Sequence, residues 1–203
     1  VARLSGRIVK ESDRLAHTID DLLELSSIEL GGDAVRELVS AGVVLEEAAD
    51  RVRPLAERRR INLTVIESSI RITALGDRRQ LVSALGNLVE NAVKYSEPDN
   101  GVEVSASTDG LMVTFRVTDH GIGIPPHHLD RIFERFYRVD RARSRDTGGT
   151  GLGLAIVRHV ATNHGGQVFV TSQEGEGSTF VLRIPAGPGP VPVSVPQEYP
   201  VAG

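Results

Sequence analysis

The chain has no cysteine and no tryptophan, a single methionine, and only 4% aromatic residues among 203 residues. The absence of cysteine excludes disulfide bonds and thiolate metal sites, and it suits a reducing compartment. No stretch approaches the roughly 18 consecutive apolar residues of a membrane span, and the first residues do not form a signal peptide. A formal net charge of −4 gives no general attraction to nucleic acid or to an anionic membrane. We therefore expect a soluble chain and, because it begins at Val1 rather than at a methionine, a piece of a longer protein.

Hydrophobic residues make up 40% of the chain, so a core of valine, leucine, isoleucine and alanine is expected. Residues 1–31 form one amphipathic pattern, which Gly31-Gly32 ends. The apolar face of that helix carries five residues: Leu4, Ile8, Leu15, Ile19 and Leu22. Because a single helix cannot bury its own apolar face, it needs a partner helix. Residues 32–185 read as one domain, and residues 186–203, rich in proline and glycine without periodicity, as a disordered tail.

Within residues 32–185, helical and strand patterns alternate. Helices are expected at about 40–60, with a kink or break at Pro54, at 77–95, at 152–163, and in a short turn opened by Pro125-Pro126. Strands are expected at 61–66, 71–75, 102–107, 111–118, 167–171 and 178–184. The last four of these strands form two hairpins, because glycine-containing turns separate the members of each pair.

The helix at 77–95 carries a polar face. Asn87, Glu90, Asn91 and Lys94 fall within about 100° of arc on it, while leucine, valine and alanine fill the other side. The face could simply be solvated. However, asparagine is a poor helix former, at a cost of about 0.5 kcal/mol relative to alanine. The alternative is a ligand face, on which the oxygens hold Mg²⁺ and Lys94 contacts phosphate. The helix alone favours neither reading.

Two glycine-marked segments follow. Asp119-His-Gly121-Ile-Gly123 comes directly after a strand and is either an ordinary turn or a turn that admits a flat base beside a carboxylate. It lacks the third glycine and the following helix of a dinucleotide-binding fold. Gly148-Gly-Thr-Gly151-Leu-Gly153 leads into a helix, whose first amides can bind an anion. It is not a P-loop, and four glycines in six residues are a costly choice for a simple connector.

The loop between these segments is rich in arginine: Arg138, Arg141, Arg143 and Arg145. Solvated charges are the ordinary explanation, and a mobile cationic lid over phosphate is the functional one. We expect Phe133 and Phe136 to anchor the base of this loop in the core rather than to stack on a ligand.

Taken together, these segments resemble the motifs of a known family. Residues 87–96, 119–123, 133–136 and 149–154 resemble, in order, the N, G1, F and G2 boxes of sensor histidine kinases of two-component systems. These kinases share an ATPase superfamily with DNA gyrase, MutL and the Hsp90 chaperones. Residues 1–31, and above all the segment from Asp20-Asp21 to Ser26, resemble the second helix of the kinase dimerisation and phosphotransfer hairpin.

The resemblance implies an α+β fold. It is a two-layer α/β sandwich of the Bergerat type, with a mixed sheet, helices on one face, and a long helix preceding it. It also implies ATP and Mg²⁺ as cofactors, with Asn91 and Glu90 at the metal and with Glu90, Asn91 and Lys94 as the catalytic residues. Asp119 would read the adenine amine, and Tyr95 would pack against the nucleotide. The implied ATP-binding residues are Asn87, Asn91, Lys94, Tyr95, Asp119, Gly121, Gly123, Ile124, Arg138, Gly149, Gly151, Leu152, Gly153, Leu154 and Thr179.

In one respect the chain departs from the family. The phosphoacceptor motif, His-(Glu/Asp)-x-(Arg/Lys)-x-Pro, does not occur in it, and His17, the only histidine of the first helix, is expected at the surface. No phosphoacceptor is therefore assigned. We expect the chain to bind ATP without phosphorylating itself, its γ-phosphoryl group going to a histidine on a helix that the sequence does not contain and then to a response-regulator aspartate.

The resemblance further implies a response regulator as partner and self-association of the parent protein through the hairpin, with no nucleic acid and no direct membrane contact. It implies a cytoplasmic location, as the soluble portion of a membrane-anchored sensor. Two other readings stay open at this stage. One is a superfamily ATPase that uses ATP as a conformational clamp, and the other is a binding module with a degenerate pocket. The box at residues 133–136 favours the kinase over the clamp, and intact Asn91 and Asp119 argue against the degenerate module.

Overall fold

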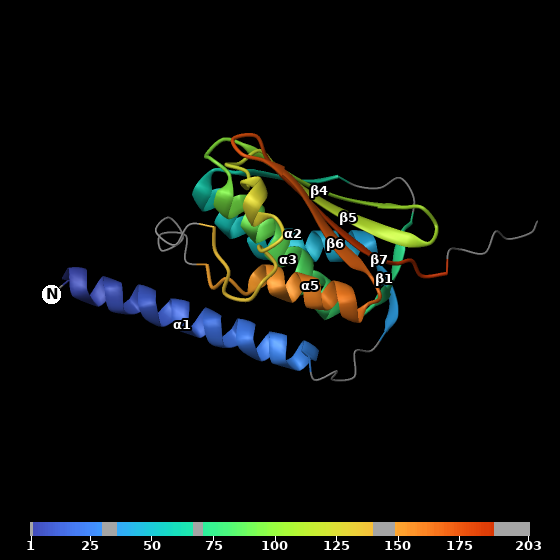
Figure 1. The fold of residues 1–203 in the computed structure, drawn as a ribbon, viewed down its shortest axis with the longest axis horizontal. Coiled ribbons are helices and arrows are strands. Elements are labelled where there is room, and N and C mark those ends of the chain that lie inside the picture. The colour runs from blue at the N-terminus through green and yellow to red at the C-terminus, as the bar shows by residue number, and fades with distance from the viewer. Residues whose placement is uncertain (1, 30–35, 67–70, 140–148, 189–203) are drawn as a thin grey trace, which may run out of the picture.

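The computed structural model describes residues 2–29, 36–66, 71–139 and 149–188. Its main feature is a five-stranded sheet in the order β2-β4-β5-β7-β6, covered on one face by helices (Figure 1). The strands are β2 (Asn62–Ile66), β4 (Gly101–Thr108), β5 (Met112–Asp119), β6 (Gln167–Gln173) and β7 (Gly177–Pro185). The covering helices are α2 (Ala41–Arg59), α3 (Arg78–Tyr95) and α5 (Gly153–Asn163), and η1 (Pro126–His128) is a short 3₁₀ turn.

The sheet is mixed, because β2 pairs parallel to β4 and the other pairs are antiparallel. Along β5, Val113, Phe115 and Val117 are fully buried under the helices, whereas Arg116 between them is exposed on the open face. This alternation is what a sheet with one covered face requires. The expected two-layer α+β sandwich, with a mixed sheet and helices on one face, is confirmed.

A second, two-stranded sheet was not predicted from the sequence. β1 (Glu37–Ser40) pairs antiparallel with β3 (Thr73–Gly76) and leads directly into α2. Val39 is the only buried residue of β1, so this four-residue strand has too little alternation to be recognised without its partner. The expected helix from about residue 40 begins at Ala41.

Two helix details refine the expectations. At the start of α3, Asp77 Oδ1 accepts hydrogen bonds from the backbone N–H groups of Arg79, at 2.8 Å, and Gln80, at 3.2 Å, and so caps the helix. In α2, the helix continues through Pro54 without a break. Val52 and Ala56, on either side of Pro54, are buried in the packed core, and this packing offsets the backbone hydrogen bond that proline cannot make.

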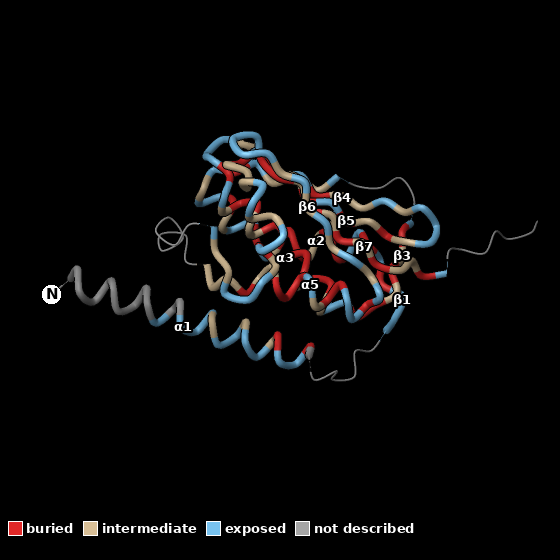
Figure 2. The backbone as a smooth tube through the Cα atoms, in the orientation of Figure 1, coloured by how far each residue is buried: buried red, intermediate tan, exposed pale blue. Residues whose placement is uncertain are grey.

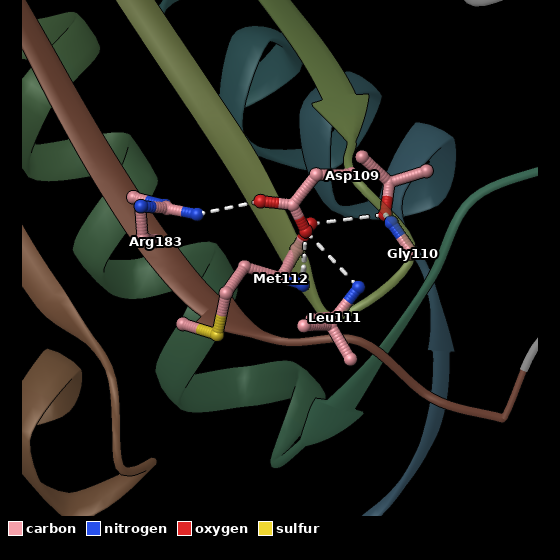
Figure 3. A network of polar contacts seen from close by, with 6 residues as sticks. Asp109, Gly110, Leu111, Met112 and Arg183 are labelled. Atoms are coloured by element: carbon pink, nitrogen blue, oxygen red, sulfur yellow. Dashed lines mark hydrogen bonds and ion pairs between the residues drawn. The ribbon is translucent and has the colours of Figure 1, made fainter.

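Both predicted hairpins form, and the turn between β4 and β5 is held by one carboxylate (Figure 3). Asp109 Oδ1 accepts from the N–H groups of Leu111 at 3.0 Å and Met112 at 2.7 Å, while its Oδ2 accepts from Arg183 Nη2 at 2.7 Å. The Met112 and Leu111 backbone bonds lower the pKa of Asp109. Because one carboxylate binds both these amides and Arg183 of β7, the turn is closed on itself and also fastened to β7.

The long first helix, α1 (Ala2–Glu29), lies along α5 on the side of the helical layer away from the sheet (Figure 1). Leu25 and Ile28 are buried near its carboxyl-terminal end, and Asn163 Nδ2 of α5 donates to the Ile28 carbonyl at 2.9 Å. Leu15, Ile19 and Leu22 are exposed, so within the described ranges the predicted apolar stripe has no partner helix (Figure 2). The side chains of Leu4 and Ile8, residues Arg141, Arg143 and Arg145, and most of the predicted tail lie outside the described residues.

In the part of the chain that the structure describes, no helix combines the length and the apolar character that crossing a membrane requires.

A buried histidine joins the ends of two helices. His164, at the end of α5, is 2% exposed, and its Nε2 accepts a hydrogen bond of 2.9 Å from the backbone N–H of Asp77 at the cap of α3. Because Nε2 is an acceptor, the ring proton sits on Nδ1, which donates to the Val160 carbonyl at 2.8 Å. Burial, with Arg36 adding to it, lowers the pKa of His164 despite the opposing Val160 bond and Asp77.

We therefore expect stability to depend on this histidine at mildly acidic pH. The folded-state pKa lies below the unfolded value, so the stabilisation is complete above about pH 6.5 and is lost as the pH falls below it. Urea unfolding between pH 8 and pH 5 should show this loss, and His164→Gln should flatten the profile. His120→Gln, at an exposed position, is the matched control and should keep the wild-type profile. Equal profiles for all three proteins would contradict the account.

Candidate functional site

A cavity of about 590 Å³ lies where the carboxyl-terminal half of α3 meets the ends of β5 and β7 and the glycine-rich loop before α5. Most of the residues singled out from the sequence line it: Asn87, Glu90, Asn91, Lys94, Tyr95, Asp119, Gly123, Ile124, Arg138, Gly149, Gly151, Gly153 and Leu154. Segments that are far apart in the sequence therefore meet in one place.

The polar face of α3 forms one wall. Lys94 Nζ pairs with Glu90 Oε1 at 2.8 Å, and the side chain of Lys94 is only 19% exposed. Asn87 Nδ2 donates to the Ser83 carbonyl at 3.1 Å, which leaves the amide oxygen of Asn87 free to face the glycine-rich loop. The opposite face of α3, including Leu85 and Leu88, is fully buried. A solvated surface does not fit these observations, because this polar face lines a cavity.

The donors on this wall suit a magnesium ion. Asn91 and Glu90 offer hard amide and carboxylate oxygens to the cavity, and Mg²⁺ typically takes one or two such protein ligands with waters and phosphate oxygens in the remaining positions. Among the described residues there is no cluster of three or more histidine, cysteine, aspartate or glutamate side chains that could hold a metal. The donor set thus fits a metal that arrives with a phosphate ligand, rather than one held by the protein alone.

Asp119 lies at the other end of the cavity, at the last position of β5. It is 6% exposed, and its Oδ1 accepts from the Gly121 N–H at 2.9 Å. Burial raises the pKa of Asp119, although the Gly121 and Ser178 backbones and His120 act in the opposite direction. Such a desolvated carboxylate can accept a hydrogen bond from a base amine.

The turn after Asp119 packs tightly on the end of α3. The Ile122 N–H donates to the Tyr95 carbonyl at 3.2 Å. A Cβ on Gly121 would lie 2.4 Å from the same carbonyl oxygen. Gly121 does not itself line the cavity, so its contribution is to let the turn approach the helix.

A serine on β6 fastens this turn to the last hairpin. Ser172 Oγ accepts from the Ile124 N–H at 2.8 Å, donates to the Gly177 carbonyl at 2.8 Å, and lies 3.0 Å from Ser178 Oγ. Ile124 and Ser178 both line the cavity. One hydroxyl group thus sets the spacing between two cavity walls.

Ser172→Ala should lower the free energy of unfolding by roughly 1–2 kcal/mol, because the Ile124 N–H loses its acceptor in a partly buried place. Thermal unfolding should show a midpoint about 2–8 °C lower. Ser107→Ala, at an exposed position of β4, is the matched control and should change the midpoint little. A Ser172→Ala protein as stable as the control would show that the network contributes nothing.

The glycine-rich loop closes the cavity beside α3. Phe136 N–H donates to the Gly151 carbonyl at 2.9 Å, and Gly151 has a φ of +78°, in the left-handed region. A Cβ on Gly153 would lie 2.5 Å from Asn87 Oδ1. The loop is therefore seated directly on the polar face of α3, with the first amides of α5 behind it.

Several residues lie elsewhere than the sequence suggested. Leu152 is fully buried in the core and does not line the cavity. Thr179 faces away from the cavity, with its Oγ1 3.2 Å from Thr118 Oγ1, while its neighbour Ser178 lines the wall. The expectation that Phe136 lies in the core is wrong: its side chain is 57% exposed, because its backbone has a φ of +61° and turns it outward. Phe133 does pack against the core.

Helix α1 also contributes to the cavity, which was not predicted from the sequence. His17, exposed as expected, and Asp21 both line the cavity, and Thr150 Oγ1 in the glycine-rich loop donates to Asp21 Oδ2 at 2.5 Å. The sequence showed Asp20-Asp21 only as part of the resemblance to the kinase hairpin. The partner of Asp21 lies 129 positions away, which no local pattern could indicate. Other lining residues that were not predicted are Ala92, Ile122, Pro125, Ile132, Tyr137, Val139, Thr150, Glu174, Ser178 and Phe180.

The chain is similar to known proteins in sequence and in fold. Residues 76–188 match the model of the family described as histidine kinase-, DNA gyrase B- and HSP90-like ATPases. A sensor-like histidine kinase from Mycolicibacterium smegmatis, SenX3, is 45% identical over 94% of this chain and 50% of its own length. The sensor protein kinase WalK of Staphylococcus aureus is 34% identical over 87% of this chain and 43% of its own length.

Solved structures agree. Full-length ShkA in complex with AMPPNP superposes with a TM-score of 0.78 and 32% identity, covering 94% of this chain and 40% of that chain. The mycobacterial sensor histidine kinase MprB gives a TM-score of 0.64 and 31% identity over 76% of this chain and 99% of that chain. This chain spans about half the length, or less, of the curated relatives it matches. It belongs to the family of histidine kinase-, DNA gyrase B- and HSP90-like ATPases, and the relatives named above are sensor histidine kinases.

Proposed function

We propose that this chain is the ATP-binding catalytic portion of a sensor histidine kinase. It would bind ATP with Mg²⁺ and transfer the γ-phosphoryl group to a histidine on a dimerisation helix that the sequence does not contain. The phosphoryl group would then pass to an aspartate of a response regulator. The parent protein would associate with itself through the hairpin to which α1 belongs.

One observation carries the proposal. A single cavity is lined by a desolvated carboxylate, Asp119, by Asn91, Glu90 and Lys94, and by residues of the glycine-rich loop. A carboxylate suits a base amine, and a cation with oxygen ligands suits a metal-bound triphosphate. The AMPPNP complex of ShkA supports the same kind of ligand.

The chain's own residues divide the task between binding and orientation. Asp119 and Gly123 would hold the base, and Tyr95 would pack against the nucleotide. Lys94 would contact the phosphates, and its ion pair with Glu90 keeps its ammonium group inside the cavity. Amides at the amino-terminal end of α5 and the side chain of Arg138 would face the phosphate charge as the loop closes. A bound Mg²⁺, held by Asn91 and Glu90, would neutralise charge that develops on the phosphate oxygens.

Transfer requires an acceptor from outside the chain. No histidine of the chain lies in the family's acceptor motif, and His17 is exposed on α1 at the mouth of the cavity. In phosphoryl transfer the protein contributes mainly positioning and electrostatic stabilisation, so a separate acceptor helix can complete the reaction.

Phosphotransfer to a separate acceptor tests the proposal. The chain would be incubated with γ-labelled ATP and Mg²⁺, alone and with a two-helix hairpin that carries a histidine in the acceptor motif of the family. We expect acid-labile label on the hairpin only when both proteins are present, and none with Asn91→Ala. Steady ATP hydrolysis without label on the hairpin would instead indicate a clamp ATPase. Acid-labile label on the chain alone would refute the expectation that it does not phosphorylate itself.

A further inference from the structure

Helix α1 places a carboxylate inside the nucleotide cavity. Asp21 lines the cavity together with residues of α3 and of the glycine-rich loop, although α1 lies outside the sheet-and-helix domain. Its Oδ2 accepts the Thr150 hydroxyl at 2.5 Å, and Thr150 Oγ1 in turn accepts the Leu152 N–H at 3.2 Å. The carboxylate is thus linked through one side chain to the entry of α5.

The position of Asp21 is fixed by the packing of α1 against the domain. Leu25 and Ile28, one and two turns further along α1, are buried against the domain, and Asn163 of α5 holds the Ile28 carbonyl. Asp21 is half-buried, whereas the adjacent Asp20 is exposed. The docked helix therefore presents one carboxylate to the cavity and its neighbour to solvent.

The charged residues around Asp21 include those that would contact the phosphates of a bound nucleotide. Burial raises its pKa, the Thr150 bond lowers it, and Glu90, His17 and Lys94 act on it through their charges. Glu90 and Lys94 are the residues that would meet a metal-bound triphosphate. A nucleotide bound there brings several negative charges close to the Asp21 carboxylate, in a place that water screens poorly. A bound nucleotide also contacts the glycine-rich loop, and Thr150 of that loop is the residue that donates to Asp21.

We propose that Asp21 is a specificity-determining residue of the nucleotide cavity: with α1 docked, it holds the glycine-rich loop through Thr150 and opposes the phosphate charge of an incoming nucleotide. The inference rests on the proposed function, and it adds that α1 docking and triphosphate binding weaken each other. Such coupling is reciprocal, so a triphosphate must loosen α1 by the same factor by which docked α1 weakens the triphosphate.

Two ligands, one with and one without the triphosphate group, test this. AMPPNP with Mg²⁺ and adenosine would be titrated into the wild-type chain, Asp21→Asn and Asp20→Asn by calorimetry. Asp21→Asn should bind AMPPNP about fivefold more tightly or better, in the usual range of coupling between sites, with adenosine affinity changed less than about twofold. Asp20→Asn removes the same charge one position away, from the exposed side, and should leave both affinities near wild type. Amide hydrogen exchange in α1 should become faster when the wild-type chain is saturated with AMPPNP.

The other outcomes overturn the inference. Weaker AMPPNP binding by Asp21→Asn would make Asp21 a residue that assists phosphate or metal binding. Equal effects of Asp20→Asn and Asp21→Asn would show that only the net charge of the chain matters. No effect of either substitution would show that Asp21 does not act on the bound nucleotide. Failure of the wild-type chain to bind AMPPNP or adenosine would overturn the proposed function itself. Wild-type binding of both ligands keeps the two questions separate.

Discussion

Replacing Asp119 with alanine should weaken ATP binding by about 10- to 100-fold. The carboxylate is 6% exposed at the end of the cavity, and in our proposal it accepts a hydrogen bond from the adenine amine. Hydrogen bonds to charged groups contribute roughly 1.5–3 kcal/mol, and each 1.4 kcal/mol corresponds to a factor of ten in affinity. Loss of the support that Asp119 gives to the Gly121 N–H adds to the effect.

Calorimetric titration with AMPPNP and with the matching guanine analogue would measure this effect. Asp119→Asn keeps the size of the side chain but adds a donor facing the adenine amine. It should therefore also weaken binding of the adenine nucleotide and reduce the ratio of adenine-nucleotide to guanine-nucleotide affinity. The raised pKa of Asp119 means that the accepting carboxylate form is lost as the pH falls through a range above the ordinary value of 3.8. AMPPNP affinity should therefore decline at a higher pH than an unperturbed aspartate would give. Near wild-type affinity in Asp119→Ala would contradict the assigned role.

Gly123→Ala should be among the most destabilising single substitutions in the turn that lines the cavity. Gly123 has a φ of +65°, and a Cβ there would lie 2.0 Å from the Gln173 carbonyl oxygen. Left-handed backbone costs a non-glycine residue about 1–2 kcal/mol, and the collision with β6 backbone must be relieved in addition. We expect a loss of about 3 kcal/mol or more in the free energy of unfolding.

Gly110→Ala provides the matched control, because Gly110 has a φ of +89° but nothing within 4 Å of the added Cβ. It should cost about 1–2 kcal/mol, from backbone strain alone. Chemical unfolding of both variants would separate strain from collision. If the two variants were equally stable, the close approach of the turn to β6 would not matter.

The sequence predicted the parts of the site that lie within single elements. Asn87, Glu90, Asn91 and Lys94 share a face because the helical period places them there, and the structure puts that face in the cavity. Asp119 follows a strand with clear alternation, so its place at a sheet end could be foreseen. The mixed sheet with helices on one face was implied by the family resemblance.

What the sequence could not predict depends on contacts between distant segments. The bond between Thr150 and Asp21 joins residues 129 positions apart, and β1 is defined only by its pairing with β3. Thr179, which the resemblance implied as an ATP-binding residue, lies on the other side of β7 from Ser178 and Phe180, because side chains alternate along a strand. The exposure of Phe136 depends on a left-handed backbone conformation, which is rare for phenylalanine and could not be predicted from the sequence.

The most direct test of the account is thermal unfolding with and without AMPPNP and Mg²⁺, for the wild-type chain and for Asn91→Ala. A ligand at 100 times its dissociation constant adds about 2.7 kcal/mol to the free energy of unfolding, and the midpoint should rise by roughly 5–10 °C. The account predicts that rise in the wild-type chain, its dependence on Mg²⁺, and its loss in Asn91→Ala. No rise in the wild-type chain, or an equal rise in Asn91→Ala, would contradict the claim that this cavity binds a metal-bound nucleotide.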